Sequence, residues 1–369
     1  MNIIIVGEFS AFAKHLKRGF SDLGHHVVVI SNGDGWKRIK GDINDIQYSD
    51  TNLTFKGKSI PYSFVYNVIK SNILIKKGLR KAFNARPIDL IIVVNYIFLS
   101  SSWTQAGVKL GYIQKQLLSG TKLIMSVCGG DPAYRLTYPD RLKEWGYTVP
   151  VEDEDVRFSF LLKNAQSIIP TSFSYYHAIE YYSSFHRVDL NKLSKAIPLP
   201  ITIKKDVVIH SCVGRKIVIF HGIIRPRMKG TYFIQPAMKR IQLDFPDRVE
   251  CICKGHMAYD EYLKVFDKID ILIDQASGNG WGMNSAIGAM MGKCVLVSCG
   301  KENGENMSIP DIPFVEIKRN EDSIYETLKM LIQHPEEIDR IKMSSRSFAE
   351  RYCDSRIVAR QYIEAVGLN

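Results

Sequence analysis

The fold is indicated by KIVIFHGIIRPRMKGTYFIQPAMKRIQL, residues 216–243. Its apolar run predicts a strand over 216–222, and the basic loop behind it leads into a helix from Thr231 to about Leu243. The same order stands at the start of the chain. There, a strand over 2–6 precedes a short loop and an amphipathic helix that Ser10 can cap. The chain therefore begins the same α/β pattern twice.

Each start is followed by short apolar strands that alternate with helical segments, which predicts two parallel sheets with helices on both faces. The expected strands are 26–31, 91–94, 122–127 and 167–170 in the first half, and 248–253, 270–274 and 294–298 in the second. The stretch IPLPITIKKD (197–206) has two prolines and no helical period, which is typical of a linker. We expect domains over 1–203 and 204–350, and a separate final helix over 351–369.

The composition is that of a globular protein, with 369 residues, 46% hydrophobic and 24% charged. That length suits two domains with sizeable cores. The seven cysteines lack framework spacing, and the first residues lack the basic start of a signal peptide. The longest apolar stretch, 88–99, is too short to span a membrane. These features predict a cytoplasmic protein in which Cys251 and Cys253 are buried thiols.

The excess of positive over negative charge lies entirely in the first half. The net charge is +11, and residues 1–205 hold 27 Lys and Arg against 16 Asp and Glu, whereas the remainder holds 22 of each. Residues 61–88 contain no acid, and their bases alternate with apolar residues. This segment is either a basic helix on an anionic membrane surface or an ordinary helix with its apolar face in the core. A nucleic-acid-binding protein is a weaker alternative, because no known recognition motif is present.

Two loops of the second half carry the chemistry. In HGIIRPRMKGT (221–231), the bases Arg225, Arg227 and Lys229 lie beside a helix N-terminus, which favours an anion such as phosphate. The alternative is a solvated basic turn. In DQASGNGWGMNSAIGAMMGK (274–293), the glycines permit close approach of a ligand to the backbone, and Asn284 and Ser285 place polar groups in the first helical turn. The alternative here is a flexible strand–helix connection.

The order of these motifs, FHG…R.RMKGT, YDEYLKVFDKIDILIDQ and G.WGMNSAIGAMMGKCVLV, resembles the donor half of group 1 (family 4) glycosyltransferases. The ending HPEEIDRIKMSSRSFAERYCD (334–354) is similar to that family as well. The resemblance covers roughly 216–366. It implies a GT-B fold, in which two doubly wound Rossmann-like domains face a cleft and the last helix crosses back to the N-terminal domain.

The resemblance also implies site residues. Arg227 and Lys229, with Arg225 beside them, would hold the diphosphate of a nucleotide-sugar donor. The loop along the sugar and phosphates would comprise Gly280, Gly282, Met283, Asn284 and Ser285. The family often has two glutamates eight positions apart, and Gly280 and Gly288 stand at those positions here. Glu302 and Glu305 could substitute for them.

The first half offers fewer candidates. Asp131, behind Gly129 and Gly130, could orient an acceptor hydroxyl or take its proton. It could equally cap the turn before Pro132. Gly7 and Glu8 end the first strand, where they meet a ligand or form a structural turn. The acidic run 152–155 is expected to open a helix over 153–163 rather than to bind a metal.

These features predict a glycosyltransferase that moves a sugar from a nucleotide diphosphate to a glycan or lipid-linked hydroxyl, with Asp131, Arg227 and Lys229 as catalytic residues. The resemblance implies a retaining reaction without metal or other cofactor. With the basic segment of the first half, we expect the protein to act in surface-glycan assembly at the inner membrane face. The missing glutamates keep open a non-catalytic partner of an active transferase. An oxidoreductase is disfavoured, because G-x-G-x-x-G follows neither first strand.

Overall fold

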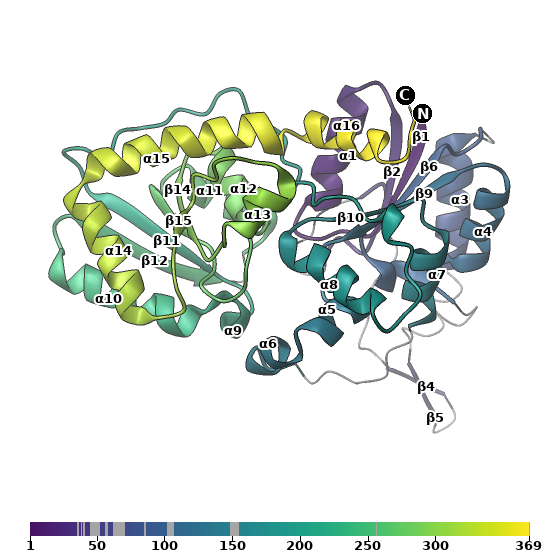
Figure 1. The fold of residues 1–369 in the computed structure, drawn as a ribbon, viewed down its shortest axis with the longest axis horizontal. Helices are drawn as coiled ribbons and strands as arrows, with labels where there is room; N and C mark the ends of the chain where they lie inside the picture. The colour runs from purple at the N-terminus through teal and green to yellow at the C-terminus, as the bar shows by residue number, and fades with distance from the viewer. Residues whose placement is uncertain are drawn as a thin grey trace.

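Two parallel sheets organise the computed structural model, which describes residues 1–34, 37, 39, 41–44, 52–55, 58–61, 71–84, 86–101, 107–147, 155–255 and 257–368 (Figure 1). In sheet order, the first has β10 (Ser167–Pro170), β9 (Lys122–Val127), β6 (Leu90–Val93), β1 (Asn2–Val6), β2 (His26–Ser31) and β3 (Ile43–Asn44). The second has β12 (Val249–Gly255), β11 (Ile217–Ile223), β13 (Ile271–Ile273), β14 (Cys294–Val297) and β15 (Val315–Glu316). We call the parts that contain them the N-terminal and C-terminal halves.

The N-terminal half covers its sheet on both faces, so the central strands are apolar over Leu90–Val93 of β6 and, after Asn2, over residues 3–6 of β1. Its helices are α1 (Phe12–Asp22), α3 (Ser71–Phe83), α4 (Leu110–Leu118), α5 (Pro132–Thr137), α6 (Pro139–Glu144), α7 (Val156–Asn164) and α8 (Phe173–Ser183). Two short strand pairs lie outside the main sheet: β4 (Asn52–Phe55) with β5 (Lys58–Pro61), and β7 (Leu99–Ser100) with β8 (Val108–Lys109).

The C-terminal half repeats this plan. Its helices are α9 (Pro226–Lys229), α10 (Thr231–Asp244), α11 (Tyr259–Phe266), α12 (Met283–Met290), α13 (Glu302–Met307), α14 (Glu321–Gln333) and α15 (Pro335–Phe348). A π-helical turn over Ala349–Cys353 then joins α15 to α16 (Ser355–Glu364).

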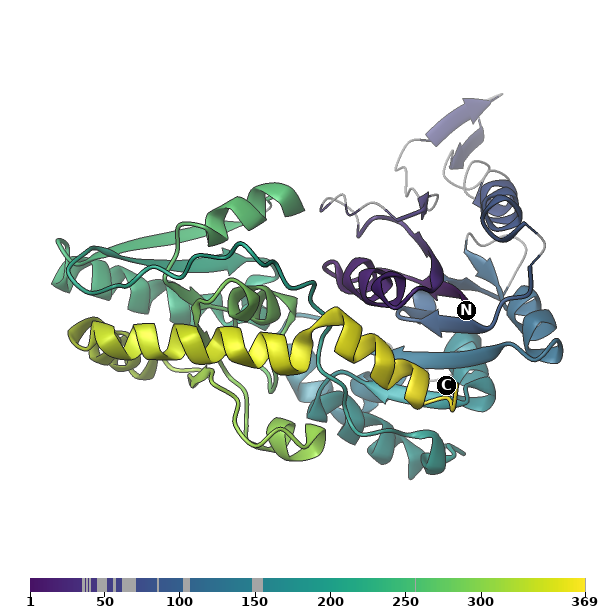
Figure 2. The same ribbon diagram turned by 90° about the horizontal axis from the view of Figure 1, so that it is seen from above.

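The last helix, α16, returns to the N-terminal half and lies across α1 (Figures 1 and 2). Gly19 makes this contact possible, because a Cβ at that position would lie 1.9 Å from the carbonyl oxygen of Ser355. Further along α16, the hydroxyl of Tyr362 is 2.7 Å from that of Ser126 on β9, and both residues are buried. The expected crossing helix is therefore confirmed.

Helix α1 begins differently from the prediction. Ser10 does not cap it, since Ser10 and Ala11 both have positive φ and the Ser10 N–H donates to Asp34. The carboxylate of Glu8 does the capping, accepting the N–H groups of Ala13 (3.2 Å) and Lys14 (3.0 Å). A longer side chain from the preceding loop thus replaces the short one that the sequence offered.

The helix expected over 153–163 is α7, which begins at Val156 because the Asp155 side chain accepts the Arg157 N–H at 2.9 Å. The other members of the acidic run, 152–154, lie outside the described residues. Cys251 and Cys253 are half-buried rather than buried, because β12 is an edge strand. They are free thiols, as are the other five cysteines.

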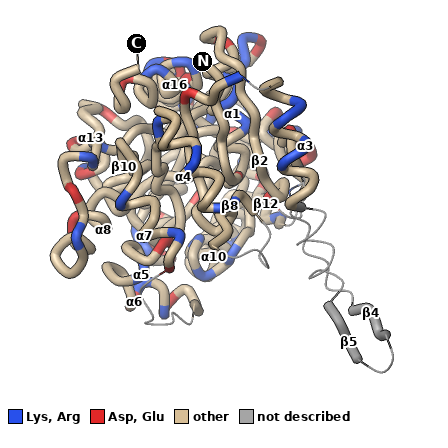
Figure 3. The backbone as a smooth tube through the Cα atoms, turned by 90° about the vertical axis from the view of Figure 1, so that its right-hand side faces the viewer, with Lys and Arg blue, Asp and Glu red and all other residues tan. Residues whose placement is uncertain are grey.

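The described part of the basic segment has an ordinary helical arrangement. Helix α3 buries Ile75, Leu79 and Phe83 in the core and exposes Lys76, Lys77, Arg80 and Lys81, which appear as the blue segments of α3 in Figure 3. Residues 62–70 of this segment lie outside the described residues. None of the described helices is both long enough and apolar enough to span a membrane.

Candidate functional site

Two pockets lie where the carboxyl ends of the C-terminal strands face the N-terminal half, the edge at which open α/β sheets bind ligands. The tyrosine pocket is lined by Ser10, Lys37, Gly222, Ile224, Lys254, Gly255, Met257, Tyr259, Tyr262, Asn284 and Ile287. The loop pocket is lined by Arg141, Glu144, Trp145, Ala276, Ser277, Gly278, Ser298, Glu316, Ile317, Lys318 and Arg319. Both halves contribute residues to each pocket, so each depends on how the halves meet.

Hydrogen bonds hold the two halves together around these pockets. The ring of His15 on α1 lies with Nε2 3.0 Å from the hydroxyl of Tyr259 on α11, and burial lowers the pKa of His15 to about 3. The Ser174 hydroxyl on α8 donates to the carbonyl of Asn279 at 3.0 Å. An ion pair between Glu144 and Arg319 closes the rim of the loop pocket.

Lys229, expected as a phosphate-binding point charge, is buried and forms an ion pair with Asp274 at the end of β13. The Ser285 hydroxyl donates to the same carboxylate at 2.7 Å, and the Gly282 N–H lies 3.4 Å from it. Burial alone would raise the pKa of Asp274, but the lysine charge and these hydrogen bonds outweigh it and lower the pKa. The positive charge of Lys229 is therefore largely compensated within the protein.

Arg225 and Arg227 are the exposed bases of this loop. Arg227 reaches the turn after α6, since a Cβ at Gly146 would lie 2.6 Å from its Nη1. The charge of Arg225 acts on the phenol of Tyr175 on α8, whose pKa burial raises well above its usual range. Both guanidinium groups thus face the N-terminal half, where an anion between the halves would meet them.

The glycine-rich loop, which was expected to follow the ligand, mainly contacts other parts of the protein. Gly280 has φ +130, and a Cβ there would lie 3.3 Å from the Ser172 side chain of the N-terminal half. Met283 is buried, and Gly282 and Ser285 contact Asp274. Of the five loop residues predicted to follow the ligand, Asn284 alone lines one of these two described pockets.

Neither Gly288, which stands at the position of one family glutamate, nor the possible substitutes Glu302 and Glu305 place a carboxylate in these two pockets. Gly288 lies on the face of α12 that packs on the sheet, where a Cβ would be 2.7 Å from the Leu272 side chain and 3.1 Å from Val295. A carboxylate at 288 would therefore enter the core. Glu302 accepts a hydrogen bond from the Asn279 amide, and Glu305 is exposed 3.9 Å from Lys301. Neither glutamate lines the tyrosine pocket or the loop pocket.

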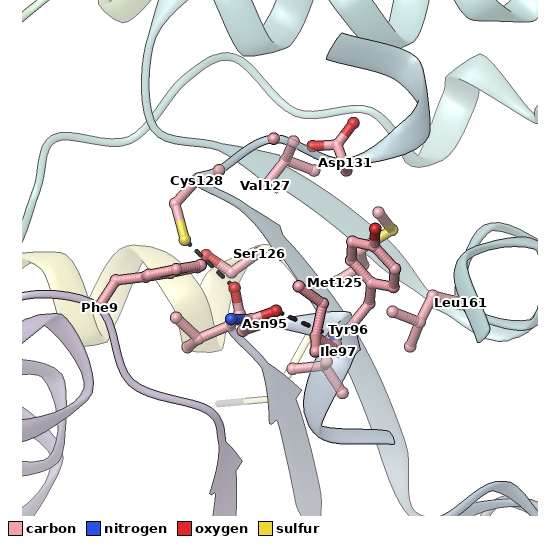
Figure 4. Close-up of a pocket in the computed structure, with 14 residues that line it drawn as sticks. Phe9, Asn95, Tyr96, Ile97, Met125, Ser126, Val127, Cys128, Asp131 and Leu161 are labelled. Carbon is pink, nitrogen blue, oxygen red and sulfur yellow. Dashed lines mark hydrogen bonds between the residues drawn. The ribbon is translucent and has the colours of Figure 1, made fainter. Parts of the chain in front are cut away.

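A third pocket, which we call the Asp131 pocket, lies at the carboxyl ends of β6 and β9 (Figure 4). Phe9, Asn95, Tyr96 and Cys128 line it together with Asp131. The Asp131 carboxylate accepts the Tyr134 N–H at 2.9 Å and so caps α5 before Pro132. Burial raises the pKa of Asp131 to about 6. The capping interpretation is confirmed, and Asp131 is also one of the residues that line this pocket.

Gly7 and Glu8 form a structural turn. Gly7 has φ +99, and a Cβ there would lie 2.8 Å from the backbone nitrogen of Asn95, so glycine is required. Glu8 is 3% exposed, and burial raises its pKa to about 7 even though two N–H groups of α1 bind the carboxylate. Gly7 and Glu8 line none of the three pockets described above.

Six described side chains carry a buried polar atom without a partner, and three of them, which the sequence did not single out as candidates, line these two pockets. They are the Tyr262 hydroxyl in the tyrosine pocket, and the Ser277 hydroxyl and Trp145 Nε1 in the loop pocket. Such atoms are rare in proteins because an unpaired buried polar group is costly. Their place in these pockets favours a polar ligand. In the described part of the chain, no three His, Cys, Asp or Glu side chains form a group that could hold a metal ion.

No protein-family model and no curated protein sequence matches this chain. Solved structures match over its length. A glycosyltransferase from Rickettsia africae is 14% identical with a TM-score of 0.55, covering 100% of this chain and 99% of that chain. HepE from Anabaena, in complex with UDP-glucose, is 12% identical with a TM-score of 0.57, covering 99% of each chain. The catalytic domain of starch synthase IV from Arabidopsis thaliana, bound to ADP and acarbose, is 13% identical with a TM-score of 0.57, covering 99% of this chain and 98% of that chain. These matches confirm the predicted GT-B fold.

Proposed function

We propose that this protein is a glycosyltransferase that moves a sugar from a nucleoside-diphosphate sugar to a hydroxyl acceptor. The observation that carries the proposal is the pair of pockets between the halves, with two exposed guanidinium groups beside them and three buried polar atoms without partners. In a ligand with an aromatic base and a diphosphate, the diphosphate would pair with the guanidinium groups, and the polar atoms of the nucleoside would pair with the unpartnered atoms. HepE and starch synthase IV, which share the fold, were solved with UDP-glucose and ADP respectively.

The donor would bind to the C-terminal half. The nucleoside would lie in the tyrosine pocket against Tyr259 and Tyr262, and the diphosphate would receive hydrogen bonds from Arg225 and Arg227. Lys229 would act through position, holding Asp274 and with it the start of α12 in place. As the diphosphate departs, the guanidinium groups would stabilise its developing charge.

The acceptor would bind to the N-terminal half. Asp131 lines its pocket with a pKa of about 6, which suits a group that accepts a proton from a hydroxyl near neutral pH. We propose a glycan or lipid-linked acceptor of surface-polysaccharide assembly, a retaining reaction and no metal or other cofactor. The exposed bases of α3 would favour a cytoplasmic protein that contacts anionic lipid at the inner membrane face.

A non-catalytic partner of an active transferase is the second candidate. The packed position of Gly288 favours it, because one of the two family glutamates has no counterpart facing the cleft. Such a protein would keep the fold and the contact surfaces while binding nucleotides weakly or not at all.

Calorimetric titration with a panel of nucleoside diphosphates and nucleotide sugars separates the two candidates. The expected result is saturable binding of one nucleotide by the wild type and binding about 10- to 100-fold weaker in Arg227→Gln, which would justify a search for the acceptor. If the folded wild type binds none of these nucleotides, the proposed transferase activity is contradicted and the non-catalytic partner becomes the favoured function.

A further inference from the structure

A fourth pocket, which we call the rear pocket, lies at the opposite edge of the C-terminal sheet from the cleft. It is lined by His210, Ser211, Arg215, Asp267, Lys268, Ile269, Asp270, Gly292, Lys293 and Lys342. Three of these residues directly precede or neighbour the starts of β11, β13 and β14, namely Arg215, Asp270 and Lys293. Because all strands of the sheet are parallel, this edge faces away from the tyrosine and loop pockets. The rear pocket is therefore a separate feature.

Part of the charge in the rear pocket is structural. Asp270 is 2% exposed, and its carboxylate accepts hydrogen bonds from Arg215 at 2.8 Å and Lys342 at 2.6 Å. Lys342 also donates to the carbonyl of His210 at 3.0 Å and lies 3.8 Å from Asp339. These contacts join α15 and the chain before β11 to the start of β13.

Lys293 does not belong to this network. It is 7% exposed, and none of the described residues lies within hydrogen-bond or ion-pair distance of its Nζ. Burial is the main cause that lowers its pKa to about 8, and Lys342 lowers it further. The side chain is buried, but its Nζ atom stays open to the pocket, where an incoming anion can reach it and form the ion pair that the described residues do not provide.

The surroundings supply further positive charge. Arg215, Lys268, Lys293 and Lys342 line the pocket against Asp267 and Asp270, and the balance stays positive when Asp339 is included. The pocket has a volume of about 360 Å³, enough for a small phosphorylated molecule. We propose that the rear pocket is a binding site for a small phosphate-bearing anion, with Lys293 as its principal ligand. This site lies outside the donor and acceptor pockets and does not depend on the proposed transferase activity.

Calorimetry with inorganic phosphate in a chloride buffer tests the site in the full-length protein. We expect one phosphate per chain and at least tenfold weaker binding in Lys293→Met. Binding should stay within twofold of the wild type in Lys264→Met, which alters an exposed lysine of α11 outside both the cleft and the rear pocket. No saturable binding by the wild type, or binding by Lys293→Met as tight as that of Lys264→Met, would overturn the proposal.

A second measurement avoids the possibility that Lys293→Met fails to fold. Reductive methylation of the wild-type protein near pH 8, followed by peptide mass spectrometry, reports the reactivity of each lysine. Saturating phosphate should slow modification of Lys293 several-fold and leave Lys264 unchanged. Equal rates for Lys293 with and without phosphate would contradict the site even if the variant cannot be made.

Discussion

Lys229 and Asp274 form a buried ion pair that joins the basic loop after β11 to the end of β13, 45 residues further along the chain. Ser285 donates to the same carboxylate, so the first turn of α12 is held as well. The three segments that surround the candidate donor site are thus fixed to one carboxyl group. The Lys229–Asp274 pair therefore holds these segments in position. The bases of the loop that remain exposed to a ligand are Arg225 and Arg227.

The pair should respond to single and double substitution in different ways. Lys229→Met leaves the Asp274 charge buried without its cation, which should cost about 3–5 kcal/mol of unfolding free energy. In Lys229→Met combined with Asp274→Asn, most of this loss should be recovered, because no unpaired charge remains. Urea denaturation of the three proteins measures both effects. Equal stability of the single and double variants would contradict the inferred pairing.

The exposed arginines should separate binding from stability. Arg227→Gln should change the unfolding free energy by less than about 0.5 kcal/mol, since the side chain is exposed. The same change should weaken nucleoside-diphosphate binding about 10- to 100-fold, the effect of losing a hydrogen bond to a charged group. Arg225→Gln should behave similarly. The matched control is Arg340→Gln on α15, another exposed arginine, and calorimetry should find its nucleotide affinity unchanged.

Gly288 should not tolerate a side chain. Gly288→Ala introduces a Cβ at 2.7 Å from Leu272 and should destabilise the protein by about 1–3 kcal/mol through overpacking. Gly111→Ala on α4 provides the control, because a Cβ there meets no atom within 4 Å. That change should stabilise by about 0.4–1 kcal/mol. Thermal or urea unfolding measures the stability of both variants. An unfolding free energy of Gly288→Ala equal to that of the wild type would disprove the tight helix–sheet contact.

Glu8 should make stability fall as the pH rises. Its pKa is raised from about 4.5 to about 7 by burial, so between these values the native protein holds a proton that the unfolded chain releases. The contribution is complete below pH 4.5 and is lost as the pH rises through about 7, amounting to at most about 3 kcal/mol. Asp131 has the same sign over a lower range, from about 3.8 to about 6.

Glu8→Gln isolates this effect, because glutamine cannot ionise. Its single carbonyl oxygen can replace only one of the two carboxylate oxygens that accept the Ala13 and Lys14 N–H groups, and that loss is the same at every pH. The quantity to measure is the difference in unfolding free energy between wild type and Glu8→Gln at several pH values. This difference should shift against the wild type between pH 4.5 and 7. A constant difference would mean that Glu8 ionises normally in the folded protein.

The amino-acid sequence by itself determined the fold and the order of its elements. Strand and helix patterns are local, so the repeated strand–loop–helix at 2–23 and 216–243 sufficed to predict two parallel sheets, and each expected strand is present within a few residues. The two-residue strands β3 and β15 at the edges of the sheets were not expected, because so short a run carries no pattern of its own. The loops that carry candidate residues were also found this way, since parallel strands end at one edge of a sheet. The crossing of the last helix was implied by resemblance, and the structure explains it by Gly19, which admits α16 against α1.

The tertiary structure alone decided which of these residues are available to a ligand. Lys229 and Arg227 stand two positions apart in the sequence, yet one is buried against Asp274 and the other is exposed, because a single turn of helix directs them to different neighbours. Ser277, Tyr262 and Lys293 gave no local signal, since an unpaired polar atom is defined by what surrounds it in space. Pairing and burial depend on contacts between distant segments, and such contacts exist only once the chain has folded.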